Sequence, residues 1–395
     1  MTRFRDPGLA LALFLALAPA VAVLQFRAIA PLALVAMAAA VVLAPRPRWA
    51  AIPAPFWLAL ALMLWGAASA LWALEPARSL FEGTRMAGLV LLAGTAGVVL
   101  AASPARALAP WLLGGLVAGG VLAAADQLSG NAVRAVVRGL REWDVTLGFG
   151  LKPAATVLAV LLPLALALPA PRAWRGAALL AALVGIFCMP AQSAKIGLVA
   201  GLAGFALVRL GGARVARAIA VGAALLVLLA PVLLGAALSR GVDASSLQGS
   251  AAHRVLIWDF TLARIAERPF LGWGMEAARA IPGGHDMIPA ADLERFGLAG
   301  QAEWFAIVRA QRLPLHTHNA GLQIWLELGV VGALLAAALI LALGWHATSA
   351  GAAGSFAAAV AIGSLSYGVW QGWWLCLLAM LTLTARQLSR ELLPR

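Results

Sequence analysis

The chain has 395 residues, of which 63% are hydrophobic and only 11% are charged, and its mean hydropathy is +0.93. This composition excludes an ordinary water-soluble protein and indicates a polytopic membrane protein. A formal net charge of +13 would suggest nucleic-acid binding in a soluble protein. In a membrane protein the placement of the charges matters more, so we expect a lipid bilayer and no nucleic acid as partner.

The apolar stretches predict the membrane spans. A helix needs about 20 apolar residues to cross the hydrocarbon core. About twelve stretches meet this need, at residues 8–26, 28–44, 55–74, 86–103, 107–125, 147–169, 174–190, 194–209, 215–238, 318–345, 352–369 and 371–388. Most arginines of the short loops fall on one set of alternate segments, which the positive-inside rule makes cytoplasmic. We therefore expect an all-α, multi-pass protein with both termini in the cytoplasm.

This topology divides the chain into three parts. Residues 1–238 hold the first nine spans, residues 239–317 form a large extracytoplasmic loop, and residues 318–395 hold the last three spans and a cytoplasmic tail. Within the loop, Ser250 is expected to cap an amphipathic helix that ends before Pro269. We expect a second helical segment from Asp292 to Gln311, so that the loop forms a small cap over one face of the bundle.

The clearest functional pattern begins where the loop ends. His316 is followed by His318 and Asn319, then after nine intervening residues by Gly329, and three positions later by Gly332. On one continuous helix both glycines would share a face with His318. One interpretation is a face for close packing against a neighbouring helix. The other is that this face holds His318 at the edge of a site open to water, where the positive end of a helix favours a neutral imidazole able to act as a general base.

Zinc binding is an alternative role for the histidines. His316 and His318 could join His285 and Asp286 as ligands. These residues are not carried by one fixed element, so we expect neither a metal nor another cofactor.

Two cations of the outer segments have more than one interpretation. Lys195 stands at the outer start of a span, where a lysine either extends to the interface or meets an anion. Arg254, one turn before Trp258, could pair with local acids, stack on the indole, or bind a diphosphate with its planar fork. Arg78 and Arg85 are interpreted as surface charges, with substrate contacts as the alternative.

Polar and aromatic residues near the last spans are also ambiguous. Gln323 and Glu327 are four residues apart and could mark an ion path or a buried pair that joins helices. Trp370, Trp373 and Trp374 are typical of an interfacial aromatic belt.

Taken together, His318, Asn319, Gly329 and Gly332 resemble the signature of the O-antigen ligase and polymerase superfamily. Further landmarks follow in the same order as in that superfamily: Ser-Ala-Leu-Trp at 69–72 with Glu75-Pro76, Ser-Ala-Lys at 193–195, Arg254-x-x-Ile257-Trp258, and Pro-Phe-Leu-Gly-Trp-Gly at 269–274. Two departures stand out. A lysine replaces the arginine that is more frequent at position 195, and Gly-Leu-Lys-Pro at 150–153 replaces an Asn-containing segment.

The resemblance implies a metal-independent, inverting glycosyltransferase of the bacterial inner membrane. It would take a glycan from undecaprenyl diphosphate at the periplasmic face, with His318 as the base or the group that positions the acceptor, and Arg254 and Lys195 binding the diphosphate. Other expected substrate contacts are Asn319, His316, Trp258, Arg78 and Arg85.

The acceptor is the hydroxyl of a lipid A core if the protein is an O-antigen ligase. It is a growing glycan if the protein is an O-antigen or exopolysaccharide polymerase, and a protein hydroxyl in O-glycosylation. A transporter of lipid-linked glycans is the alternative from another class, in which Glu327 and Gln323 would line the path.

Overall fold

The structure, a computed structural model, describes residues 6–44, 52–103, 106–141, 145–148 and 150–391. These residues form α-helices and short 3-10 turns, and their β-structure is an isolated bridge between Met287 and Gln311. The expected all-α, polytopic fold is confirmed. By length and composition, six stretches could each cross a membrane, and α7 and α15 are shorter apolar helices.

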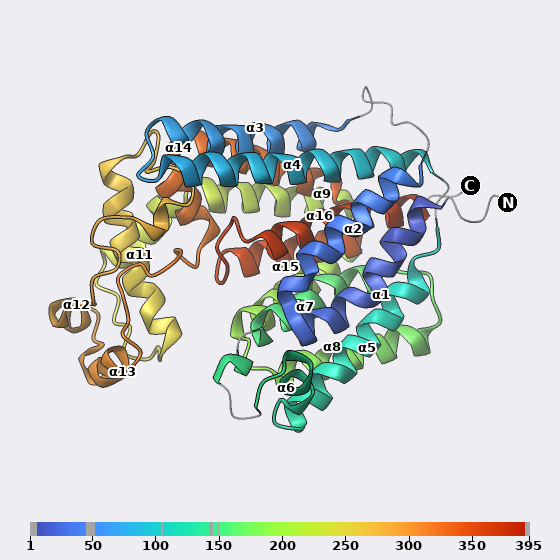
Figure 1. Cartoon of the computed structure of the whole chain (residues 1–395), viewed down its shortest axis with the longest axis horizontal. Helices are drawn as coiled ribbons and strands as arrows, with labels where there is room; N and C mark the ends of the chain where they lie inside the picture. The colour runs from blue at the N-terminus through green and yellow to red at the C-terminus, as the bar shows by residue number, and fades with distance from the viewer. Residues whose placement is uncertain (1–5, 45–51, 104–105, 142–144, 149, 392–395) are drawn as a thin grey trace.

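A bundle of long helices makes up most of the molecule (Figure 1). Its members are α1 (Pro7–Gln25), α2 (Ile29–Val42), α3 (Ala54–Ala68), α4 (Pro76–Ala102), α5 (Ala109–Leu128), α7 (Leu151–Leu166), α8 (Arg172–Cys188), α9 (Gln192–Leu228), α14 (Ala320–His346), α15 (Ala350–Gly363) and α16 (Gly372–Glu391). Each of the twelve predicted apolar stretches contains at least part of one of these helices. Small residues permit the close packing: a Cβ at Gly115 would lie 2.2 Å from the carbonyl oxygen of Leu15.

The helix α9 holds two of the predicted spans. Its first turn bonds to the α15–α16 loop through Ser193 and Ser366, and near its last turn the carbonyl of Val227 accepts from Trp325. Both ends of α9 therefore lie near the start of α14, which a straight helix of 37 residues could not achieve. The chain reverses at Gly212, whose φ of 64° and ψ of −155° break the helix.

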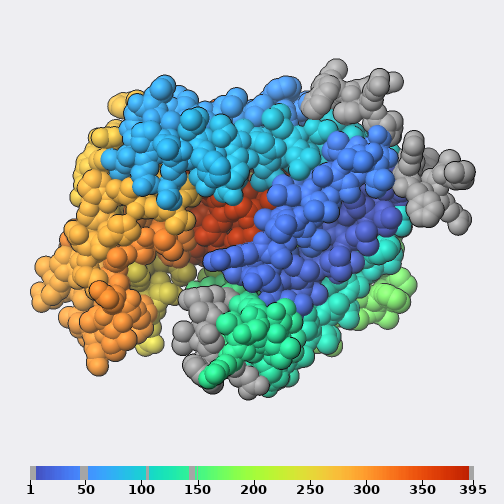
Figure 2. All heavy atoms as spheres, in the orientation of Figure 1, coloured from blue at the N-terminus to red at the C-terminus, as the bar shows by residue number. Residues whose placement is uncertain are grey.

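The loop between α10 (Ala230–Leu238) and α14 forms a cap at one end of the bundle (Figure 1). It contains α11 (Ser250–Glu267), α12 (Ala290–Arg295) and α13 (Ala302–Ile307). The helix α11 begins where predicted, but its N-cap is Gly249 and no side chain caps it. The second predicted helix consists of α12 and α13 with a short connection. Figure 2 shows a hollow between the yellow and orange cap and the green region around α6 (Ala132–Arg138).

The end of the bundle opposite the cap holds the start of α1 and the end of α16. Asp6 pairs with Arg106 there, and Arg390 donates to the carbonyl oxygens of Leu100 and Ser103. The cap and the described chain ends thus lie at opposite ends of the bundle (Figure 1).

Two interpretations of side chains near the cap end are wrong. Trp370, Trp373 and Trp374 are buried, not interfacial, and the indoles of Trp373 and Trp374 pack around Tyr367. Their apolar neighbours along α16 make the burial favourable.

The sequence places Arg134 with Arg138 and Arg141 in a short outer loop, where arginines are interpreted as surface charges, but the side chain of Arg134 is fully buried. It pairs with Asp126 at 2.5 Å and donates to the carbonyl oxygen of Leu147. Such a pair is tolerated because its partners satisfy the charge.

Candidate functional site

His318 lies at the cap end, in the two residues that precede α14. Its φ of 55° is in the left-handed region, which is uncommon for a residue with a Cβ. The ring Nδ1 is 2.7 Å from the carbonyl oxygen of Ser366 in the α15–α16 loop, and Ser366 Oγ accepts from Ser193 Oγ at 3.1 Å. Three segments far apart in sequence therefore fix the position of this ring.

The hydrogen bond to Ser366 determines the tautomer of His318. A carbonyl oxygen can only accept, so Nδ1 must carry the proton. In the neutral ring the free lone pair is then on Nε2. Burial lowers the pKa of His318 well below its usual value, and His316 and Arg254 act in the same direction. The imidazole is therefore neutral at physiological pH and its Nε2 can accept a proton.

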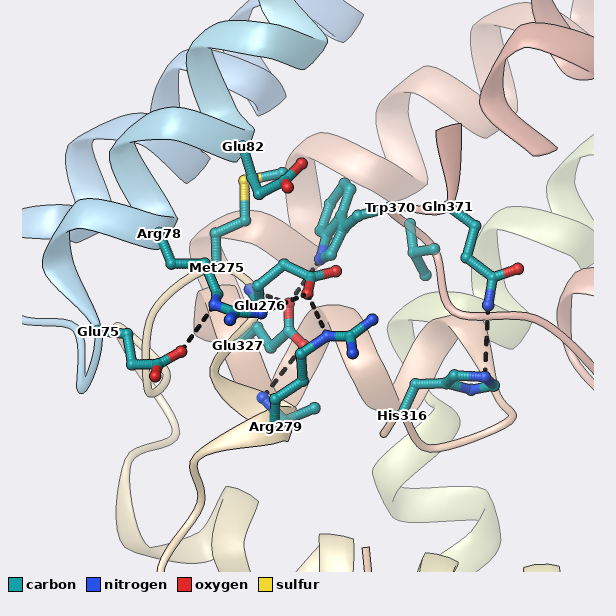
Figure 3. Close-up of polar contacts among 12 residues, drawn as sticks. Glu75, Arg78, Glu82, Met275, Glu276, Arg279, His316, Glu327, Trp370 and Gln371 are labelled. Atoms are coloured by element: carbon teal, nitrogen blue, oxygen red, sulfur yellow. Dashed lines mark hydrogen bonds and ion pairs between the residues drawn. The ribbon is translucent and has the colours of Figure 1, made fainter. Parts of the chain in front are cut away.

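His316 supports His318 directly. Its Nδ1 accepts from the backbone N–H of His318 at 3.2 Å, and the two ring centroids are 4.2 Å apart. Burial, with the charges of Arg279 and Arg254, lowers the pKa of His316 to about 4. Its Nε2 lies 3.5 Å from the amide of Gln371 (Figure 3). Both histidines are therefore neutral, and His316 acts on the backbone that carries His318.

The prediction that His318 starts the helix is wrong by two residues. The N-cap of α14 is Asn319, whose side-chain oxygen accepts from Leu322 N at 2.9 Å. Trp258 Nε1 donates to the carbonyl oxygen of Thr317 at 3.0 Å, so the cap helix α11 also holds this turn. In the structure Asn319 and Trp258 orient the histidine segment through these bonds.

Arg254 lies on α11, one turn before Trp258, at the same end of the bundle as His316 and His318. We call this end of the bundle, below the cap, the mouth. The charge of Arg254 acts on both His316 and His318. Among the described residues it forms no ion pair, and its Nε is buried without a hydrogen-bond partner. A cation in this state favours an anionic ligand.

Lys195 lies in the first turn of α9, two residues after Ser193. Its ammonium is 5.5 Å from the centre of the Phe187 ring. Two helical residues differ by about 200° in direction, so Lys195 points away from the Ser366 contact. The structure brings Arg254 and His318 together, and places Lys195 on the same end of the bundle but over α8.

One of the two signature glycines, Gly329, breaks α14. Gly329 has φ 63° and ψ −161°, so it does not lie on a continuous helical face with His318 as predicted. The segment at 269–274 enters the break: Val330 N donates to Pro269 O, and Trp273 N donates to Leu326 O, both at 2.9 Å. A Cβ on Gly329 would lie 2.2 Å from the carbonyl oxygen of Phe270. Two of the landmarks identified in the sequence are thus one packed unit.

Glu327 of α14 links the docked segment at 269–274 to the loops that contain Glu276 and Trp370 (Figure 3). It is fully buried, and its two oxygens accept from Glu276 N at 2.8 Å, Trp370 Nε1 at 2.5 Å and Gln323 Nε2 at 3.0 Å. Gln323 in turn accepts from Val369 N. Of the two interpretations of Gln323 and Glu327, this geometry favours a pair that joins elements. Its partners are mostly backbone groups of distant loops, which the sequence does not reveal.

Arg78 and Arg85 both have carboxylate partners. Arg78 pairs with Glu75 at 2.8 Å and approaches Glu276 at 3.8 Å (Figure 3), and Arg85 pairs with Glu82 at 2.5 Å. Both side chains are more than 40% exposed, as the surface interpretation requires.

His285 lies apart from the histidine pair. Its Nε2 is 2.7 Å from the carbonyl oxygen of Arg279, and its Nδ1 is 3.4 Å from Gln311 Oε1. In the part of the chain that the structure describes, no three His, Cys, Asp or Glu side chains are grouped as metal ligands.

Comparison with known proteins identifies the central segment. Residues 177–337 match the family model described as O-antigen ligase, and this range includes Lys195, Arg254 and His318. Provisionally named polysaccharide ligases are similar over shorter stretches: that of Rickettsia conorii is 35% identical over 135 residues, 32% of this chain and 29% of the relative. That of Rickettsia bellii is 33% identical over 157 residues, 38% of this chain and 35% of the relative. The chain thus aligns with about a third of the length of these relatives.

Proposed function

We propose that this chain, a multi-pass membrane protein that belongs to the O-antigen ligase family, transfers a glycan from undecaprenyl diphosphate to a hydroxyl of the lipid A core. The transfer takes place at the cap end of the bundle, which we assign to the periplasmic face of the bacterial inner membrane. The observation that carries the proposal is the position of His318, whose Nδ1 is bonded to the carbonyl oxygen of Ser366 so that Nε2 is the acceptor, near Arg254, which forms no ion pair among the described residues.

The proposed reaction is a single displacement at the anomeric carbon. The acceptor oxygen forms a bond to this carbon while the bond to the diphosphate oxygen breaks, and the electron pair leaves with the diphosphate. His318 Nε2 takes the proton of the acceptor hydroxyl. Attack from the face opposite the leaving group inverts the configuration. The diphosphate gains charge in the transition state, and cations held in place can stabilise that charge.

Arg254 is proposed to bind the diphosphate through its planar fork. Lys195 is proposed to add a second positive charge from α9, which requires its side chain to leave the Phe187 ring.

His318→Ala in purified protein, supplied with lipid-linked glycan and lipid A core, tests the proposal. We expect transfer to fall at least about a hundredfold, the range attributed to a general base, with unchanged melting temperature. His346→Ala, an exposed histidine at the far end of α14, is the matched control and should retain full activity. Undiminished transfer by His318→Ala would remove this histidine from the mechanism.

The acceptor is tested in cells that lack the protein. Loss of long-chain lipopolysaccharide with accumulated long lipid-linked glycan is the result expected for a ligase. Accumulation of single lipid-linked repeat units would instead assign the chain as a polymerase.

A further inference from the structure

We propose that Lys152, in the first turn of α7, is a third cation of the donor site and binds the second phosphoryl group of the lipid diphosphate beside Arg254. This inference rests on the proposed function, because it takes the diphosphate as the ligand. The family match begins at residue 177 and does not include this lysine.

The helix α7 places Lys152 at the mouth that holds His318. One turn further along the same helix face, Thr156 Oγ1 is 2.9 Å from the hydroxyl of Tyr367. Tyr367 follows Ser366, whose carbonyl oxygen fixes His318. Lys152 is therefore one turn closer to the cap than Thr156, which is bonded to the loop that positions His318. The side chain of Lys152 is exposed there.

The start of α7 is itself fixed by close packing. Gly150 has φ 105°, and a Cβ there would lie 3.0 Å from Arg138 Nη2 and 3.1 Å from the ring of Phe26. A residue with a side chain is therefore disfavoured at this position. The glycine sets where the helix begins, and hence the direction in which Lys152 leaves it.

Lys152 and Arg254 are close enough for the charge of one to act on the other. Among the described residues neither forms an ion pair with a carboxylate, and Arg254 Nε has no hydrogen-bond partner. Two uncompensated positive charges repel each other, and an anion between them removes the repulsion.

Three arginines of the cap on the opposite side of α11 have carboxylate partners. Arg264, Arg295 and Arg312 pair with Glu267, Asp259 and Asp292 respectively. Arg254, on the side that Lys152 approaches, has no such partner among the described residues.

The ligand that fits has two linked anionic groups. A guanidinium fork binds one phosphoryl group in two places, and a lysine ammonium suits the other as a point charge. Lys152 supplies this second charge without moving away from an aromatic ring, as Lys195 must.

The test compares binding of undecaprenyl diphosphate and undecaprenyl monophosphate, measured as thermal stabilisation of the full-length protein in detergent. Wild type should bind the diphosphate more tightly than the monophosphate. Lys152→Met should weaken diphosphate binding about ten- to hundredfold, as expected for one charge-assisted contact, and leave monophosphate binding within about threefold. Lys152→Arg should restore most of the preference. Arg240→Met, which removes an exposed charge after α10, should behave as wild type.

A Lys152→Met protein that keeps the full preference for the diphosphate would overturn the inference, and so would a wild type without such a preference. Kinetics give an independent readout: Lys152→Met should raise the KM for the lipid-linked donor and leave the KM for the acceptor unchanged. If wild type binds the diphosphate through Lys152 but transfers no glycan, the proposed function fails and the assignment of Lys152 stands.

Discussion

Replacement of Glu327 tests whether its side chain holds the loops that contain Glu276 and Trp370 to α14. Glu327→Ala removes the acceptor of three fixed donors, Glu276 N, Ala278 N and Trp370 Nε1, and of the side-chain amide of Gln323. A buried donor without a partner costs about 1–3 kcal/mol, so we expect a loss of about 4 kcal/mol in the free energy of unfolding. With an unfolding entropy of about 2.1 cal/mol/K per residue, this corresponds to a fall of about 5 °C in melting temperature.

Glu327→Gln sharpens this prediction. The amide keeps one oxygen, but its NH₂ group meets donors where the carboxylate accepted. We expect about half of the loss seen in Glu327→Ala. Melting temperatures in detergent provide the measurement, with Glu303→Ala, an exposed residue of α13, as the control. A change of less than about 1 °C in Glu327→Ala would refute the role derived from the hydrogen bonds.

Further predictions concern pH, the helix break, the buried ion pair and Lys195. Because the pKa of His316 is lowered to about 4, its neutral form contributes stability that is fully present above its unfolded pKa of about 6.5. This stability is lost as pH falls toward 4, by up to about 3 kcal/mol. Denaturant titrations at pH 7 and pH 4.5 would measure the loss, and equal stability of a His316→Ala variant and wild type across that range would contradict the prediction. Gly329→Ala should displace the docked segment at 269–274, since its Cβ would meet a backbone carbonyl, and limited proteolysis should then cut the cap faster than in wild type. Asp126→Ala leaves Arg134 buried without its partner and should cost about 3–5 kcal/mol in chemical unfolding, whereas a loss below about 1 kcal/mol would show that the pair is dispensable. Lys195→Met should raise the donor KM if the lysine reaches the diphosphate, and unchanged kinetics would limit its role to the contact with Phe187.

The sequence predicted the helices well because hydrophobic length is a local property. Composition alone distinguished the predicted spans at 194–209 and 215–238, even though the structure joins them through Gly212. The start of α11 was also predicted to within one residue, since the helix begins at Ser250, the residue predicted as its cap. Its cap differed, because capping depends on torsion angles that composition does not determine.

The candidate site was only partly predictable. His318 and Arg254 were identified from residue type and order, and the structure brings them to one mouth. The break at Gly329 was missed, because glycines three residues apart fit a packing face as well as an interruption. Lys152 carried no signal in the sequence beyond its departure from the family pattern, since its relation to Arg254 depends on how α7 meets the cap.

The docked segment at 269–274 constrains how the protein is made. Without it, the buried carbonyl oxygens of Leu326 and Glu327 next to the break in α14 would lose their backbone donors, Trp273 N and Gly274 N. The segment is synthesised before α14 and must be available when that helix inserts. The broken helix therefore depends on the docked segment, and a chimaera that exchanges caps between relatives would have to exchange both partners of the joint.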